Sequence, residues 1–384
     1  MFKPLFLSLL AMNLSLSADL MLVGIDEKMT WDEEGTLIKR STDQNDRVAI
    51  YDIAENPFKP TLKANLKLVN SIFGPPSNMA VSKDEKWAYA ANSLKWIKTN
   101  GEWGWEPNRE LHIISLAGDP KHVKTIQVGL QPSGIDLRGD LLLVTNREEN
   151  SISVLRVKGA EVEPLKKIDT SDSPAGVSIS PDGKLALFIK KSVHKVGVLH
   201  ISGHEVNYDS NLDIHVGIEP YNVKISPVGN IALVNNIGFT NGNDGNVDSV
   251  SVIDLEAKRP FVRDIVAVGD GPEGLSFNHD GSMAVAVLIH GSHKAKADPN
   301  TAWAYHKNGA IAIMKITGKK VRKTQFIEVG GMPEGVVFSE KGDYLYIGNF
   351  KSKDLSIFKI ENGKVIEKET RFVLEGAPAT MARN

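Results

Sequence analysis

The sequence predicts an all-β protein, a seven-bladed β-propeller of four-stranded antiparallel blades. Three observations lead to this fold class: a proline-centred repeat, a constant strand pattern within each repeat, and one repeat divided between the two ends of the chain. Together they account for the chain after residue 18.

The repeat is marked by short segments in which a glycine or aspartate and a proline precede an alternating strand, as in VGLQPSGIDL, GDGPEGLSFN and GGMPEGVVFS. The prolines recur 42 to 61 residues apart, and repeats of this length with four strands each are typical of propeller blades. The repeat prolines are Pro76, Pro132, Pro174, Pro220, Pro272, Pro333 and Pro378.

The unit at residues 175–217 shows the pattern within one blade. An alternating strand leads into a Pro-Asp-Gly turn, a second apolar strand, a polar connection and two further strands. Gly183 supplies the positive φ that the tight turn requires. One such sheet cannot bury both of its faces, so the blades are expected to stack around a ring.

The two ends of the chain complete the count of blades. After Pro378 there is room for one short strand, TMAR, whereas LMLVG at residues 20–24 matches the second strand of the other units. The C-terminal strand is therefore predicted to pair with the N-terminal blade, which closes the ring and removes an exposed sheet edge.

The stretches PAGVSISPDGKLALFI, LLLVTNREENSISVLRV and YLYIGNFKSKDLSIFKI resemble YVTN-type repeats. The resemblance covers nearly the whole chain after residue 18 and implies a lactonase-like seven-bladed β-propeller. Such propellers include lactonase-like enzymes, cell-surface proteins and binding scaffolds, so the resemblance predicts the fold more narrowly than the function.

Composition and the N-terminal segment bound the cellular setting. Residues 1–18 combine one lysine, an apolar run and small residues, the layout of a secretory signal peptide, and residues 19–384 are then a single propeller domain. We expect an exported protein, periplasmic or secreted, without a membrane span. The chain has no cysteine, which excludes disulfides and thiolate chemistry.

One face of the ring is predicted to carry the working site. The connections between second and third strands are long in four blades, at residues 26–46, 93–109, 237–248 and 289–309. Insertions add little closure entropy, and loops on a rigid scaffold commonly bind ligands. The residues after the repeat prolines should lie on the same face, at the mouth of the central channel: Ser77, Ser133, Ala175, Tyr221, Glu273, Glu334 and Ala379.

Glu273 and Glu334 occupy equivalent places in neighbouring blades, so their carboxylates should face one channel mouth. Two close carboxylates share a proton, pair with a lysine or bind a cation. The resemblance to lactone-hydrolysing propellers implies that these glutamates, with Asn222 and Asn78, hold a divalent cation such as calcium. Structural hydrogen bonding to linker amides is the alternative.

Histidines and aromatic residues supply further candidates. His290 and His293 in the longest insertion are candidate metal ligands or bases, with ordinary loop histidines as the alternative. Aromatic side chains in the long connections suit stacking on a ligand or partner, or pinning the loops together. The ligand-binding candidates are Trp31, Trp96, Trp103, Trp105, Tyr221, Trp303 and His306.

Three functions stay open at this point. The first is binding of a polar or aromatic small molecule, or of a protein partner, on the loop-rich face. The second is a lactonase-like hydrolase with a site at the channel mouth, in which Glu273, Glu334 and Asn222 hold a cation and a histidine activates water. The third is a non-catalytic partner subunit of a periplasmic enzyme. Nucleic acid is disfavoured because the net charge is −2 and acidic residues interleave with the lysines.

Overall fold

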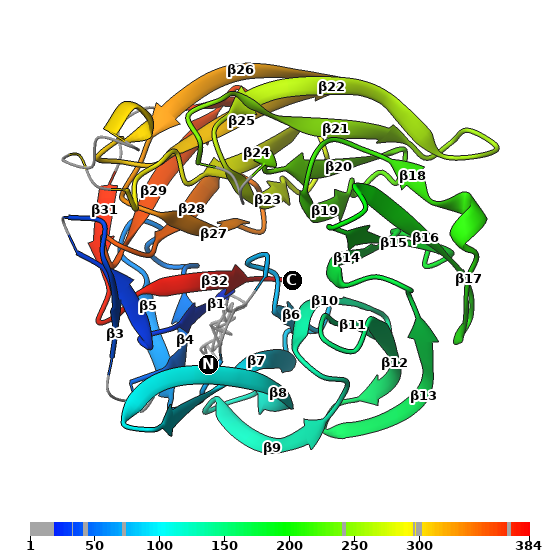
Figure 1. The fold of residues 1–384 in the computed structure, drawn as a ribbon, viewed down its shortest axis with the longest axis horizontal. Helices are drawn as coiled ribbons and strands as arrows, with labels where there is room; N and C mark the ends of the chain where they lie inside the picture. The colour runs from blue at the N-terminus through cyan, green and yellow to red at the C-terminus, as the bar shows by residue number, and fades with distance from the viewer. Residues whose placement is uncertain are drawn as a thin grey trace, which may run out of the picture.

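The structure, a computed structural model, is a ring of seven β-sheets around a central channel (Figure 1). It describes residues 19–32, 34–40, 45–70, 74–239, 243–294, 296, 302–366 and 370–384. The predicted signal peptide lies outside the described residues. No helix among those residues is long and apolar enough to cross a membrane.

The blades follow one another around the ring in sequence order, and in each the innermost strand comes first. Blade one consists of β32 (Pro378–Ala382), β1 (Leu20–Ile25), β4 (Arg47–Asp52) and β5 (Thr61–Leu66). Blade two consists of β6 (Met79–Val81), β7 (Trp87–Thr99), β8 (Glu102–Ser115) and β9 (Lys121–Gln127). Blade three consists of β10 (Pro132–Arg138), β11 (Leu141–Asn146), β12 (Ser151–Lys158) and β13 (Glu161–Asp169).

The remaining blades keep this order. Blade four has β14 (Pro174–Ile179), β15 (Leu185–Lys190), β16 (Lys195–Ser202) and β17 (Glu205–Tyr208), with β18 (Ile214–His215) also beside β16. Blade five has β19 (Pro220–Ile225), β20 (Ile231–Asn236), β21 (Asp248–Asp254) and β22 (Phe261–Gly269). Blade six has β23 (Pro272–Phe277), β24 (Met283–Leu288), β25 (Ala310–Thr317) and β26 (Lys320–Glu328). Blade seven has β27 (Pro333–Phe338), β28 (Tyr344–Asn349), β29 (Asp354–Glu361), β30 (Lys364–Val365) and β31 (Thr370–Val373).

Three short elements lie outside the blades. A two-stranded ribbon, β2 (Met29–Trp31) and β3 (Leu37–Lys39), rises from blade one. Two 3₁₀ turns, η1 (Ser210–Leu212) and η3 (Ala302–Ala304), belong to the connections of blades four and six. The predicted all-β propeller is confirmed.

The ring closes between the two ends of the chain, as the split repeat predicts. β32 pairs antiparallel with β1, with Leu22 opposite Ala382 and Val23 opposite Met381. Met381 also packs in a buried cluster with residues of β1 and with Tyr346 and Leu355 of blade seven. The C-terminal strand therefore joins blade one to blade seven by both hydrogen bonds and apolar contact.

The core lies between neighbouring sheets. One buried cluster joins strands of blades five and six, and another joins strands of blades six and seven. Such clusters form because the strands alternate and each sheet face is covered only by the next blade.

Each repeat proline begins an innermost strand, where a missing N–H is tolerated. In β10, β14, β23 and β27 the pairing shifts register directly after the proline, for example between Pro272 and Leu275. Irregularities of this kind redirect the side chains beside them. They bring the residue after the proline to the channel mouth.

Gly24 tests the closure of the ring. A Cβ atom at this position would lie 2.5 Å from Thr380 Cγ2 and 2.6 Å from Asn70 Oδ1. We expect Gly24→Ala to push β32 away from β1 and to lower the free energy of unfolding by about 1–3 kcal/mol, measured by urea denaturation. Gly104→Ala is the matched control, because a Cβ there meets nothing within 4 Å. Equal stability of the two variants would contradict the closing role of this contact.

Candidate active site

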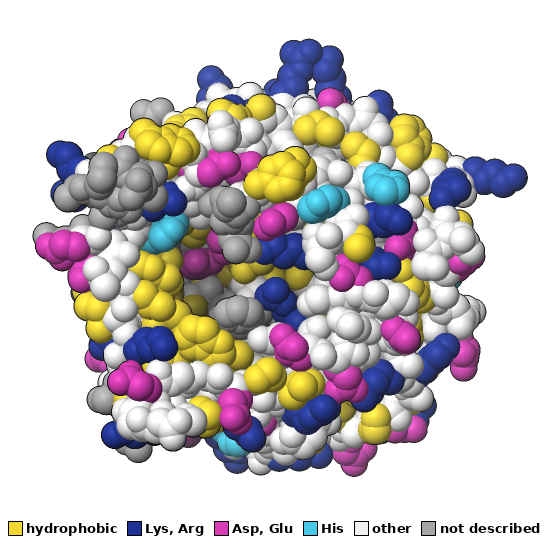
Figure 2. Space-filling view, in the orientation of Figure 1, with side chains coloured by type: hydrophobic (Ala, Val, Ile, Leu, Met, Phe, Trp, Pro, Cys, Tyr) yellow, Lys and Arg dark blue, Asp and Glu magenta, His cyan; other side chains and the backbone are white. Residues whose placement is uncertain are grey.

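A cavity of about 410 Å³ opens at the loop-rich mouth of the channel. Its described wall has a charged and hydroxylated part and an apolar part. The first part consists of Asp26, Arg147, Lys191, Tyr221, Glu273 and Glu334. The second consists of Met29, Trp31, Trp105, Ile237, Met332, Phe350 and Ala379. Figure 2 shows a hollow near the centre of the ring, with hydrophobic side chains on one flank and Lys or Arg side chains on the other.

Two repeated positions supply most of this wall. The residue after the repeat proline contributes Tyr221, Glu273, Glu334 and Ala379 from the innermost strands of blades five, six, seven and one. This agrees with the placement that the repeat predicts. The residue directly after the second strand contributes Asp26, Arg147, Lys191, Ile237 and Phe350 from blades one, three, four, five and seven.

The second position was missed as a site position in the sequence. Its signal was present, because each of these residues follows an apolar strand at the same offset in its blade. At a common offset, side chains from different blades point toward the same part of the ring. Arg147, Ile237 and Phe350 are therefore found by register rather than by residue type.

Glu273 and Glu334 lie side by side, and their carboxyl groups are hydrogen-bonded to each other. Burial raises the pKa of Glu273 to about 7, although Lys191 and the hydrogen bond from Glu334 oppose the rise. Burial, the Glu273 charge and the same hydrogen bond all raise the pKa of Glu334 well above its usual range. At neutral pH the pair holds one proton, on Glu334.

Positive charge beside the pair is already matched. Lys191 lies 3.2 Å from the Glu219 carboxylate and 5.3 Å from the centre of the Tyr221 ring. Arg147 donates a hydrogen bond to the Tyr221 phenol oxygen. Burial and the Glu273 charge raise the pKa of Tyr221 far above its usual value, so the phenol stays neutral.

Asp26 is held at the cavity edge by a buried cation. The ammonium group of Lys28, which is fully buried, lies 3.1 Å from Asp26 Oδ1 and also contacts Asp46. Burial raises the pKa of Asp46 to about 7, because the repulsion of Asp26 adds to the loss of solvent and outweighs the attraction of Lys28. This cluster fixes the start of the blade-one connection.

The tryptophans divide between the cavity and the packing of its rim. Trp96 is 6% exposed, donates from Nε1 to the Arg40 carbonyl at 2.9 Å, and stacks on both Trp103 and Trp105 at centroid distances of 6.4 and 6.2 Å. The β7–β8 hairpin is thereby pinned to the blade-one connection. Trp31 and Trp105 line the cavity, whereas Trp303 lies outside its wall and is 66% exposed.

Within the described residues, no histidine lines the cavity. His290 stacks on His306 at a centroid distance of 3.7 Å and meets Phe326 of β26 edge-on. His293 packs edge-on against Trp31, and burial together with Lys294 and Lys351 lowers its pKa to about 4. His293 is therefore a neutral packing residue at neutral pH in this geometry, and the catalytic roles of His290 and His293 stay predictions.

The predicted cation ligands do not converge. Asn222 Nδ2 donates to the Glu273 carbonyl at 3.3 Å and Asn78 Nδ2 to the Ala91 carbonyl at 2.9 Å, so both amides lie against strand backbone and outside the cavity wall. Their Oδ1 atoms are buried without a hydrogen-bond partner. Among the described residues no group of three or more His, Asp or Glu is arranged to hold a metal ion. This donor set does not fit calcium, and the metal role stays a prediction.

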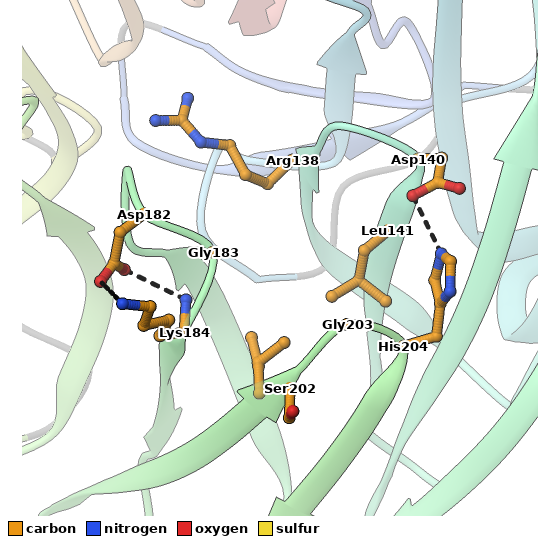
Figure 3. Close-up of a pocket in the computed structure, with 10 residues that line it drawn as sticks. Arg138, Asp140, Leu141, Asp182, Gly183, Lys184, Ser202, Gly203 and His204 are labelled. Carbon is orange, nitrogen blue, oxygen red and sulfur yellow. Dashed lines mark hydrogen bonds and ion pairs between the residues drawn. The ribbon is translucent and has the colours of Figure 1, made fainter.

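A second hollow, of about 440 Å³, lies on the opposite face between blades three and four (Figure 3). It is formed by short turns, and its charged groups are used locally. His204 Nε2 lies 2.9 Å from Asp140 Oδ1, Asp182 accepts the Lys184 backbone N–H, and Arg138 donates to the Pro181 carbonyl. No carboxyl pair occurs among its lining residues, so the loop-rich cavity is the better candidate.

Comparisons with known proteins agree with this fold. Residues 35–224 match the family described as lactonase, 7-bladed beta-propeller. No curated protein matches the sequence. The solved structures that resemble the chain are less than 25% identical to it, so they show the fold alone.

Three of these structures cover almost the whole chain. A putative 6-phosphogluconolactonase from Bacteroides fragilis has 16% identity and a TM-score of 0.70, covering 96% of this chain and 98% of its own. A functionally unknown protein from Desulfotomaculum acetoxidans has 14% identity and a TM-score of 0.68, covering 95% and 99%. A periplasmic gluconolactonase from Pseudomonas aeruginosa has 17% identity and a TM-score of 0.65, covering 95% and 98%.

The shared proton has a spectroscopic consequence. At pH 7 we expect an infrared carbonyl band from a protonated carboxylic acid that disappears in Glu334→Gln. Glu149→Gln is the control, because hydrogen bonds from Lys167, the Leu130 amide and Arg109 overcome its burial and hold the Glu149 pKa at about 2. Identical difference spectra for the two variants would show that the pair holds no proton at this pH.

Proposed function

We propose that this chain, a lactonase-like seven-bladed β-propeller, hydrolyses a lactone in the cavity at the channel mouth. The observation that carries the proposal is the pair of hydrogen-bonded carboxyl groups, one ionised and one protonated, on the wall of that cavity. Two carboxyl groups whose pKa values are driven apart are suited to separate base and acid roles. The family match and the fold relatives support the same class of reaction.

The pair can serve both halves of the reaction. The Glu273 carboxylate takes a proton from water as the water oxygen bonds to the lactone carbonyl carbon. Glu334 gives its proton to the ring oxygen as the acyl C–O bond breaks, which leaves a hydroxy acid. The proton on Glu273 then passes to Glu334 through their shared hydrogen bond, so the pair returns to its starting state.

Neighbouring donors are placed to orient the substrate. Arg147 and the neutral Tyr221 phenol lie on the same wall as the pair, and both carry hydrogen-bond donors. Donors aimed at the carbonyl oxygen stabilise the negative charge that develops there during attack. Lys191 keeps the pKa of Glu273 from rising further, which preserves a base at neutral pH.

Glu273→Gln removes the base while keeping the side chain's size. We expect kcat for lactone hydrolysis to fall by about 10²–10⁴-fold, measured as hydroxy-acid release after subtraction of spontaneous hydrolysis. The control is Glu163→Gln on an outer strand, where Glu163 pairs with Arg156, and it should keep full activity.

Two outcomes would contradict this mechanism. Unchanged activity in Glu273→Gln would exclude the pair as catalyst. Loss of activity on chelation, or on replacing His290 or His293 by alanine, would favour the alternative in which a cation and a histidine activate water. Ligand binding without turnover would favour the binding or partner function predicted from the tryptophans.

The pH dependence follows from the two raised pKa values. Glu273 acts as a base only when ionised, so kcat/KM should rise as pH increases through about 7. Glu334 acts as an acid only when protonated, so activity should fall again at a higher, alkaline pH. In Lys191→Met the pKa of Glu273 should rise, and the acidic limb of the profile should move to higher pH. A flat profile from pH 5 to 9 would contradict the assignment.

A further inference from the structure

The composition of the cavity wall constrains the substrate beyond the reaction class. Hydrogen-bonding side chains gather around the carboxyl pair, whereas the opposite wall is made of carbon-rich side chains such as Trp31, Met332 and Phe350. Trp31 and Phe350 meet edge to face at 6.2 Å and form a continuous apolar surface with Met332. Across from the pair, the wall offers few hydrogen-bond partners to a polyhydroxylated ring.

The charges of the wall argue against an anionic substrate. Lys191 pairs with Glu219 at 3.2 Å, and Arg147 is engaged by Tyr221. The carboxyl pair itself keeps one negative charge, and Asp26 adds another that Lys28 offsets. A phosphate group would therefore enter a site whose cations already have partners and which holds fixed carboxylates.

We infer that the substrate is an uncharged lactone with an apolar substituent, an alkyl-substituted δ- or γ-lactone in chemical class. This inference rests on the proposed hydrolytic function. The lactone carbonyl lies at the carboxyl pair, and the substituent lies against Trp31, Trp105 and Phe350. Sugar lactones are discriminated against because each hydroxyl placed on this wall loses its hydrogen bonds to water without replacement.

Trp105 sets the outer limit of the apolar wall. It is 39% exposed, stacks on Trp96 and lies on the β7–β8 hairpin outside the blade core. Removing its ring deletes apolar surface from the cavity without emptying a core position. Trp105 is therefore a specificity residue that can be tested without unfolding the ring.

The test compares δ-hexalactone, δ-octalactone, δ-decalactone, glucono-δ-lactone and 6-phosphoglucono-δ-lactone as substrates. Each further methylene buried against the wall is worth about fourfold, so kcat/KM should rise about tenfold between successive alkyl lactones until the cavity is filled. Both sugar lactones should be hydrolysed more slowly than δ-decalactone. Rates are corrected for spontaneous opening of each lactone.

Trp105→Ala should lower kcat/KM for δ-decalactone by about tenfold more than for δ-hexalactone, because only the longer chain reaches the deleted ring. Trp303→Ala, a tryptophan replacement on the same face outside the cavity, should leave the ratio of the two substrates within about twofold of the original. The ratio separates loss of an apolar contact from general damage to the hairpin.

The two proposals fail in different ways. Faster hydrolysis of either sugar lactone, or an equal loss for short and long alkyl lactones in Trp105→Ala, would overturn the substrate inference while the hydrolytic function stands. Failure to hydrolyse every lactone of the panel would overturn the proposed function, and the substrate inference with it.

Discussion

The pairing of β32 with β1 is the constraint on which the rest of the structure depends. A propeller blade buries its faces only against its neighbours, so a gap between the first and last blades would expose two sheet faces and two edges at once. The antiparallel register of Leu22 with Ala382 and Val23 with Met381 fills that gap with backbone hydrogen bonds. Met381 adds apolar contact to blade seven, so closure is also part of the core.

Closure gives the channel mouth its chemistry, because a ring repeats each position at a common distance from the axis. The residue after the proline and the residue after the second strand both meet at the mouth, and most of the cavity wall comes from these two positions. In neighbouring blades six and seven the first position holds glutamate. Two carboxyl groups are thus forced together by repeat geometry, and burial makes them share a proton.

The long connections add the apolar half of the cavity to this charged half. They are anchored by contacts that the blades do not supply: the buried Lys28 cluster at the start of the blade-one connection and the stack of Trp96 between Trp103 and Trp105. Loops that are fixed in this way can present rigid aromatic surface at little entropic loss on binding. The aromatic residues therefore serve partly as wall and partly as support for the wall.

The sequence by itself determined the blades, their number, the closing strand and the face that carries the long connections, because proline spacing and strand alternation are local patterns. It also placed Glu273 and Glu334 at one mouth, since both follow a repeat proline. Only the tertiary structure decided which other side chains join them. Arg147 and Phe350 lie 203 residues apart in the chain and meet at one cavity, whereas Asn222 and Asn78 turn to strand backbone. The physical reason is that side-chain direction and burial arise from packing between blades, which a one-dimensional pattern does not contain.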